Sequence, residues 1–117
     1  MKDIDLKIRT KKFALRIINP FTSRPKTTEA QVIGKQVLRS GTSVGAQYRE
    51  ACRARSNSEF ISKMQSSLQE LDETSYWFEL LVEGQIVDAS KLQSLRAEAN
   101  ELTAIFVSSV KTAKTKK

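Results

Sequence analysis

Apolar side chains recur every three or four residues along almost the whole chain, which is the spacing of one face of an α-helix. Turn-forming residues interrupt this pattern at three places, the first of them Asn19-Pro20. The pattern predicts four helices over residues 4–19, 28–54, 57–83 and 89–112, followed by a tail over residues 113–117. No segment shows the clear alternation of apolar and polar residues that is typical of a half-buried strand.

Capping signals mark the ends of these predicted helices. Thr28 with Gln31, and Ser56 with Glu59, have the spacing of a capping box, in which a side chain satisfies the first free backbone N–H groups. Gly84 is expected to end the third helix in a left-handed conformation. The helices therefore have defined ends and short connections.

The third and fourth predicted helices each carry an apolar seam whose residues follow alternating steps of three and four, which favours lengthwise helix packing. In the third helix the seam is Phe60, Met64, Leu68, Leu71, Ser75, Phe78 and Val82. In the fourth it is Leu92, Leu95, Ala99, Leu102, Phe106 and Val110. Four amphipathic helices joined by short loops predict an all-α fold, an antiparallel up-down four-helix bundle, as a single domain over residues 1–117.

The second predicted helix carries three stripes on different faces. The basic stripe is Lys35, Arg39, Arg49 and Arg53. The apolar stripe, centred about 180° away, is Ile33, Val37, Val44, Tyr48 and Ala51. A third stripe consists of Gly34, Gly41 and Gly45. Because all three keep their phase through residues 40–45, we predict one continuous helix; the main alternative is a break at residues 40–43, where glycine weakens the helix.

The glycine stripe has two interpretations. Gly41 and Gly45 permit close packing inside the bundle, or they form a flat surface for self-association. Trp77 and Leu80 lie away from the seam of the third helix, and such an apolar patch needs cover. We therefore predict a homo-oligomer with Gly41, Gly45, Trp77 and Leu80 at its interface.

Charge is distributed unevenly along the 117 residues, whose formal net charge is +7. Residues 1–55 hold 13 Lys and Arg against 4 Asp and Glu, whereas residues 56–96 hold 3 against 7. The basic half either contacts a polyanion or pairs with the acidic segment, within the fold or between subunits.

The composition argues against an enzyme. The chain has no histidine and one cysteine, so histidine-dependent catalysis and the usual zinc sites are excluded. We predict no catalytic residue, no metal site and no cofactor; an enzyme using Cys52 is a remote alternative to its interpretation as a small packing residue. Without a signal-peptide core or a run of roughly 18 apolar residues, the expected location is cytoplasmic and no membrane partner is expected.

The basic stripe is the strongest candidate for binding. Lys35, Arg39, Arg49, Arg53 and the following Arg55 are predicted to face solvent and to contact phosphates of a nucleic acid. Structured RNA suits a helix face that recognises shape. The simpler alternative is a solvated surface with local ion pairs, such as Glu50 with Arg53.

The segment QVLRSGTSVGAQYREACRARS, residues 36–56, resembles a four-helix-bundle family encoded in intervening sequences of bacterial large-subunit ribosomal RNA genes. Segments 59–64 and 72–81 fit as well, and the family is similar in fold to the accessory protein of diversity-generating retroelements. The resemblance implies a ring, commonly a pentamer, with a basic surface proposed to bind nucleic acid through Arg39, Arg49, Arg53 and Arg55. An alternative is a structural or adaptor oligomer that binds an acidic protein partner such as a reverse transcriptase.

Overall fold

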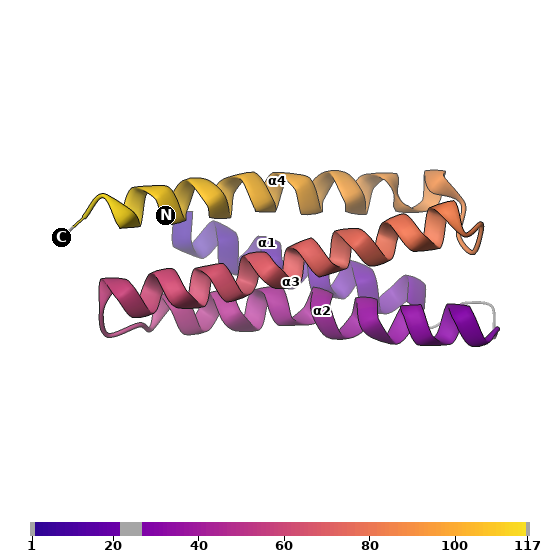
Figure 1. Ribbon diagram of the computed structural model, residues 1–117, viewed down its shortest axis with the longest axis horizontal. Helices are drawn as coiled ribbons and strands as arrows, with labels where there is room; N and C mark the ends of the chain where they lie inside the picture. The colour runs from indigo at the N-terminus through magenta and orange to yellow at the C-terminus, as the bar shows by residue number, and fades with distance from the viewer. Residues whose placement is uncertain (1, 22–26, 117) are drawn as a thin grey trace.

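A computed structural model describes residues 2–21 and 27–116 (Figure 1). It contains four helices in these residues: α1 (Lys2–Phe21), α2 (Thr28–Cys52), α3 (Asn57–Glu83) and α4 (Ala89–Lys114). The described residues include no strand, which confirms the predicted all-α class. The helices lie lengthwise in a molecule that measures 50 × 22 × 19 Å.

Each helix packs mainly on its neighbour in sequence. α2 lies against both α1 and α3, α4 lies against α3, and α1 touches α4 at few positions. Figure 1 shows the α2–α3 connection at one end of the molecule, together with the start of α1 and the end of α4. The α3–α4 connection lies at the other end.

The core follows the predicted apolar stripes of α2 and α4. In α2, Val37, Val44, Tyr48 and Ala51 are buried, and every predicted seam residue of α4 is buried. The Tyr48 and Phe106 rings stack with their centroids 5.5 Å apart, joining the two helices across the core.

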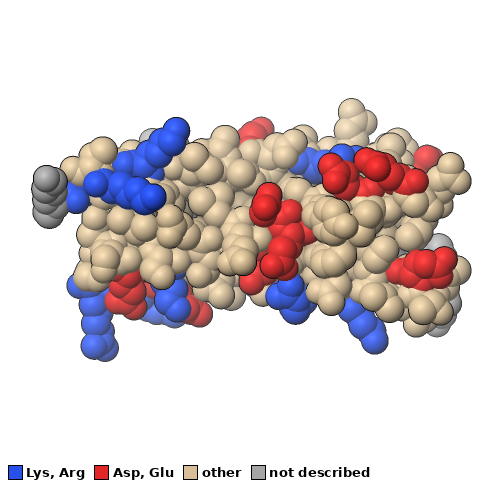
Figure 2. Space-filling model, in the orientation of Figure 1, with Lys and Arg blue, Asp and Glu red and all other residues tan. Residues whose placement is uncertain are grey.

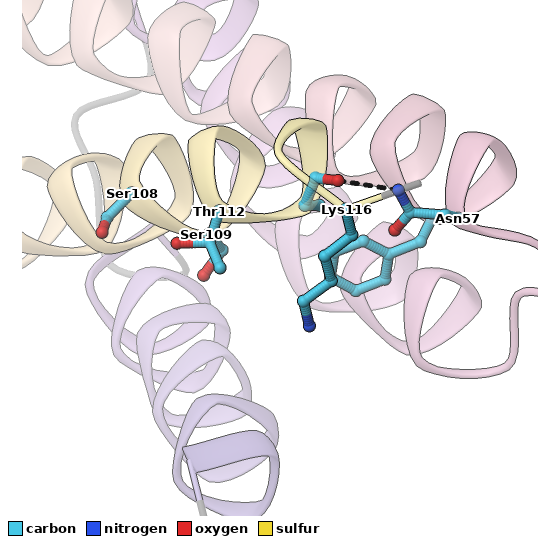
Figure 3. A pocket seen from close by; sticks show the side chains of 7 residues that line it. Asn57, Ser108, Ser109, Thr112 and Lys116 are labelled. Carbon is cyan, nitrogen blue, oxygen red and sulfur yellow. Dashed lines mark hydrogen bonds between the residues drawn. The ribbon is translucent and has the colours of Figure 1, made fainter.

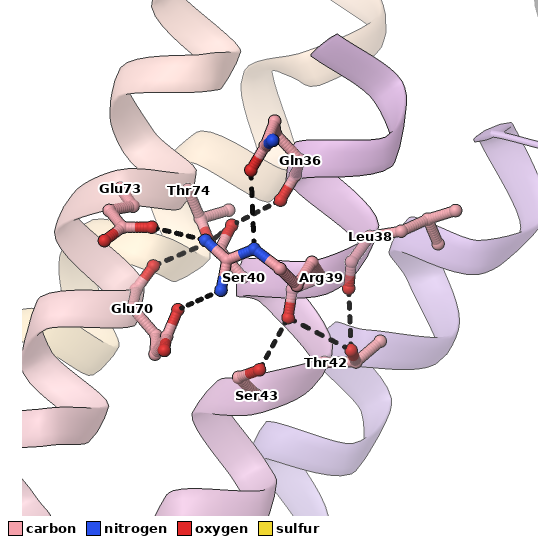
Figure 4. A network of polar contacts seen from close by, with 9 residues as sticks. All are labelled: Gln36, Leu38, Arg39, Ser40, Thr42, Ser43, Glu70, Glu73 and Thr74. Atoms are coloured by element: carbon pink, nitrogen blue, oxygen red, sulfur yellow. Dashed lines mark hydrogen bonds and ion pairs between the residues drawn. The ribbon is translucent and has the colours of Figure 1, made fainter. Parts of the chain in front are cut away.

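The buried face of α3 is rotated relative to the prediction. Met64, Leu71 and Phe78 are buried as expected, but the other fully buried positions are Ser67, Thr74 and Leu81 rather than Leu68, Ser75 and Val82. Hydrogen bonds explain the buried hydroxyls. Ser67 donates to the Val44 carbonyl oxygen at 2.8 Å, and the Thr74 and Ser40 hydroxyl oxygens lie 2.7 Å apart (Figure 4).

α2 is continuous through residues 40–43, so the predicted single helix is confirmed and the alternative break is wrong. The hydroxyls of this segment donate to carbonyl oxygens of the preceding turn: Ser40 to Gln36 at 2.9 Å, and Ser43 to Arg39 at 2.6 Å (Figure 4). The side chains thus find hydrogen bonds within the helix and do not compete with it.

The helix ends differ from the predictions in detail. The N-cap of α2 is Thr27 rather than Thr28, because the Thr27 hydroxyl accepts from the Ala30 N–H at 3.2 Å. The predicted Ser56 cap of α3 is confirmed by its bond from the Glu59 N–H at 3.0 Å. Gly84 has a φ of −79°, and the left-handed residue is Gln85, with a φ of 60°.

Four boundaries shift by two residues, and the first is the start of α1, which begins at Lys2 rather than at residue 4. α1 extends to Phe21 past the expected stop before Pro20, α2 ends at Cys52 rather than at residue 54, and α4 continues to Lys114 into the predicted tail.

Candidate nucleic-acid interface at the basic face

The basic residues singled out in the sequence lie on one side of α2 and just beyond its end. Lys35, Arg39, Arg49, Arg53 and Arg55 are all exposed. The three positions within α2, Lys35, Arg39 and Arg49, lie opposite the buried apolar stripe because of their spacing. From Lys35 to Arg53 the helix rises about 27 Å at 1.5 Å per residue, so the face is long enough to meet several phosphates.

Arg39 differs from its neighbours because two carboxylates hold it. Its Nη2 atom lies 2.6 Å from Glu73 Oε1, and its Nη1 atom lies 3.5 Å from Glu70 Oε1 (Figure 4). Burial raises the pKa of Glu70; the nearby Arg39 charge opposes that rise and the Glu73 charge adds to it. Arg39 therefore joins α2 to α3 and is the least available of the five cations.

A second ion pair joins the same two helices. Lys63 Nζ lies 2.6 Å from Glu50 Oε1, and this hydrogen bond lowers the pKa of Glu50 and raises that of Lys63. The expected local pair of Glu50 with Arg53 is replaced by this contact, because α3 brings Lys63 closer. Some charges of the basic half of the sequence are thus paired with charges of the acidic segment within the fold.

A third cluster, not found from the sequence, holds α1 to α4. Arg9 donates from Nε and Nη2 to the two carboxylate oxygens of Glu98 at 3.1 and 2.8 Å, and from Nη2 to Glu101 at 2.8 Å. These bonds raise the pKa of Arg9. The only local signal was the i,i+3 spacing of Glu98 and Glu101, which does not reveal a partner on α1.

Three of the five predicted cations, Arg49, Arg53 and Arg55, lie toward one end of the molecule. No ion pair with a residue of the described ranges is made by Arg49, Arg53 or Arg55. The charge of Arg53 nevertheless contributes to the lowered pKa of Glu50. The exposed lysines at the end of α4 lie at the same end of the bundle (Figure 1). Figure 2 shows several basic side chains at this end with some acidic ones beside them, and side chains of both charges toward the middle and the opposite end. We name this set the basic end: Arg49, Arg53, Arg55, Lys111, Lys114 and Lys116.

The family model of the 23S rRNA-intervening sequence proteins matches residues 2–108. The chain belongs to this family. It is also similar to a crystal structure of a protein of unknown function from the S23 ribosomal protein family of Bacteroides thetaiotaomicron, with 37% identity and a TM-score of 0.85. The match covers 95% of this chain and 99% of that one. No curated protein sequence matches the chain.

In this 23S rRNA-intervening sequence protein, two of the four residues predicted at an oligomer interface are covered by the chain itself. A Cβ added to Gly41 would collide with Cδ1 of Ile17, and one added to Gly45 would lie 3.1 Å from the Thr10 hydroxyl. Gly41 and Gly45 therefore let α1 approach α2 closely, which favours the first interpretation of the glycine stripe, close packing inside the bundle; a role for them at an interface stays a prediction.

Trp77 and Leu80 are half-buried, and Trp77 packs against the core with its ring 5.3 Å from that of Tyr76. A role for them at an interface stays a prediction. A more exposed apolar face lies on α1 of this family member: Ile8, Leu15 and Ile18 are 47%, 49% and 38% exposed, and their spacing places them on one side.

Cys52 is half-buried and packs against the core. Residues 2–21 and 27–116 contain no cluster of His, Cys, Asp or Glu that fits a metal ion. Within the same ranges, no helix has the length and apolar character needed to span a bilayer.

Proposed function

We propose that this protein is a non-catalytic homo-oligomer that binds structured RNA through the basic face of α2 and the basic end. The single observation that carries this is the group of exposed arginines, Arg49, Arg53 and Arg55, whose guanidinium groups make no ion pair with a described carboxylate. Phosphates of an RNA backbone are well matched to guanidinium groups, which bind them in a bidentate manner.

The helical scaffold supports the proposal because it presents these cations on a rigid element. We infer an antiparallel up-down bundle, for which the alternating ends of the connections in Figure 1 are the support. The part of the chain that the structure describes includes no sheet for reading bases. Such a bundle suits recognition of backbone shape and charge rather than of sequence.

Replacing Arg49 and Arg53 together with alanine is expected to weaken binding to an RNA hairpin at least about 100-fold, because two charged contacts worth about 1.5–3 kcal/mol each are lost. The slope of log affinity against log salt should fall by about 2, which is about 1 for each phosphate contact. Fluorescence anisotropy with a labelled hairpin, titrated between about 50 and 200 mM salt, measures both quantities.

The matched control removes the same charge from α4, through Lys91→Ala and Arg96→Ala, and should change affinity little. Equal loss in the two double variants would show that only net charge matters. Unchanged affinity in the Arg49/Arg53 variant would refute the proposed RNA site.

Self-association is the second part of the proposal, and the exposed α1 face is its support. Leu15→Glu is expected to lower the molecular mass measured by light scattering at tens of micromolar, because it places a charge among the apolar residues that a second subunit would cover. The control is Val32→Glu, at an α2 position that is 55% exposed. The resemblance implies a pentamer; a wild-type monomer at this concentration would contradict the oligomer.

The alternative is an adaptor oligomer that binds an acidic protein partner such as a reverse transcriptase. The contact of Arg39 with Glu70 and Glu73 favours it, since this face already accepts carboxylates. Wild-type protein that binds no RNA hairpin, even at low salt, would favour this alternative over RNA binding.

A further inference from the structure

A groove of about 470 Å³ lies where α3 begins and α4 ends, within the basic end (Figure 3). Its volume falls in the range of small-molecule sites, about 300–1,000 Å³. Three hydroxyl residues of α4, an amide and a ring of α3, and a lysine beyond α4 line it: Ser108, Ser109, Thr112, Asn57, Phe60 and Lys116. None of these residues belongs to the basic face of α2.

Hydrogen bonds fix the walls of the groove to each other. The Asn57 side-chain amide donates to the Ala113 carbonyl oxygen at 2.7 Å, joining the start of α3 to the end of α4 (Figure 3). The backbone N–H of Lys116 donates to the same carbonyl oxygen at 3.2 Å. The groove is therefore preformed, and a ligand would lose little free energy in ordering it.

The polar groups of the groove remain available. The hydroxyls of Ser108, Ser109 and Thr112 make no hydrogen bond with a described residue, whereas the Thr103 hydroxyl bonds to the Ala99 carbonyl oxygen on the same helix at 2.8 Å. Ser108 and Thr112 are four residues apart and so lie on one side of α4. With the exposed Lys116, they offer hydroxyl and ammonium donors to an anionic ligand with several oxygens.

The ring of Phe60 gives the groove a second kind of contact. Phe60 is half-buried, so part of its surface stays open, and an aromatic surface beside cationic and hydroxyl groups is how proteins hold unstacked bases. A hollow of about 430 Å³ at the start of α4 provides a contrast. Ser90, Arg96 and Asn100 line it, but none of its lining residues is aromatic.

We propose that the groove binds one unpaired nucleotide of an RNA, with the base against Phe60 and the phosphate at Lys116 and the α4 hydroxyls. This assignment rests on the proposed RNA binding and adds a preference for an unpaired nucleotide. The basic face of α2 holds the duplex by its charge, and the groove selects RNAs that present an unpaired nucleotide close to it.

The test compares two labelled RNA hairpins, one with a blunt end and one with a single unpaired adenosine at its 3′ end. The full-length protein is expected to bind the tailed hairpin roughly 5–100-fold more tightly, as one stacked base allows. Phe60→Leu keeps an apolar side chain and should abolish this preference without weakening binding to the blunt hairpin. Lys116→Ala, at an exposed position outside the helices, should reduce it without risk to folding.

The controls separate this assignment from the proposed function. Arg49→Ala with Arg53→Ala should weaken both hairpins equally and keep their ratio, and Arg96→Ala in the contrasting hollow should leave the ratio unchanged. Equal binding of both hairpins by the wild type would overturn the groove assignment and leave RNA binding intact. Adenosine monophosphate that binds alone more tightly than the tailed hairpin would assign the groove to a free nucleotide and overturn it as an RNA site.

Discussion

Phe106→Ala is expected to remove about 3–5 kcal/mol from the free energy of unfolding, the range for truncating a buried phenylalanine. Phe106 is fully buried on α4 and stacks on Tyr48 of α2, so its loss opens a cavity between two helices. A domain of this size has a total stability of about 5–15 kcal/mol, and the variant should be close to unfolding. Urea denaturation followed by circular dichroism measures the change.

Val107→Ala is the matched control, because Val107 is the next residue of α4 and is 38% exposed. Its effect should stay within about 0.5 kcal/mol, as for most surface substitutions. Similar losses in the two variants would contradict the placement of the core in α4.

Gly41→Leu is expected to destabilise the protein by about 1–3 kcal/mol, the cost of overpacking a core. The sign of the change is informative. In an open helix, replacing glycine with leucine stabilises by up to about 1 kcal/mol. Here even a Cβ atom collides with the end of the Ile17 side chain, which is itself fully buried, so the larger side chain must displace that side chain or the helix that carries it. The same urea denaturation measures the change.

Ala46→Leu provides the comparison on the same helix, because Ala46 is exposed. This substitution should change the free energy of unfolding very little. If Gly41→Leu instead raised stability, α1 would not cover Gly41, and the glycine would be available again as an intersubunit contact.

How far the sequence predicted the fold depended on how apolar each seam is. The α4 seam is apolar at every step, and the structure buries all of it. In α3 the pattern was misleading, because Ser67 and Thr74 look like surface residues until a partner on α2 is known. Their partners, the Val44 carbonyl and the Ser40 hydroxyl, lie 23 and 34 residues away in sequence.

The candidate site shows the same limit. Exposure of the basic stripe followed from the phase of α2 alone. The ion pairs of Arg39 with Glu70 and Glu73 could not be predicted in this way, because they depend on how α3 is placed along α2. Gly41 and Gly45 fit two packing partners equally well in the sequence, and only the position of α1 decides between them.

No local sequence pattern could have predicted the groove. Asn57 and Ala113, whose hydrogen bond closes it, are 56 residues apart, and Phe60 was interpreted only as a seam residue. Its chemistry arises from the meeting of two helix ends.

The hydroxyl contacts between α2 and α3 also restrict how these helices slide past each other. The Ser67 hydroxyl reaches its acceptor, the Val44 carbonyl oxygen of α2, in one register only, and the contact between the Ser40 and Thr74 hydroxyls depends on the same register. A shift of α3 by one turn would preserve much of the apolar contact but would separate the buried Ser67 hydroxyl from its acceptor, at a cost of about 1–3 kcal/mol if the group stays unsatisfied. Buried polar groups in a helical bundle thus disfavour helix pairs in a shifted register, which apolar contacts alone would tolerate. The folded chain therefore adopts a single register.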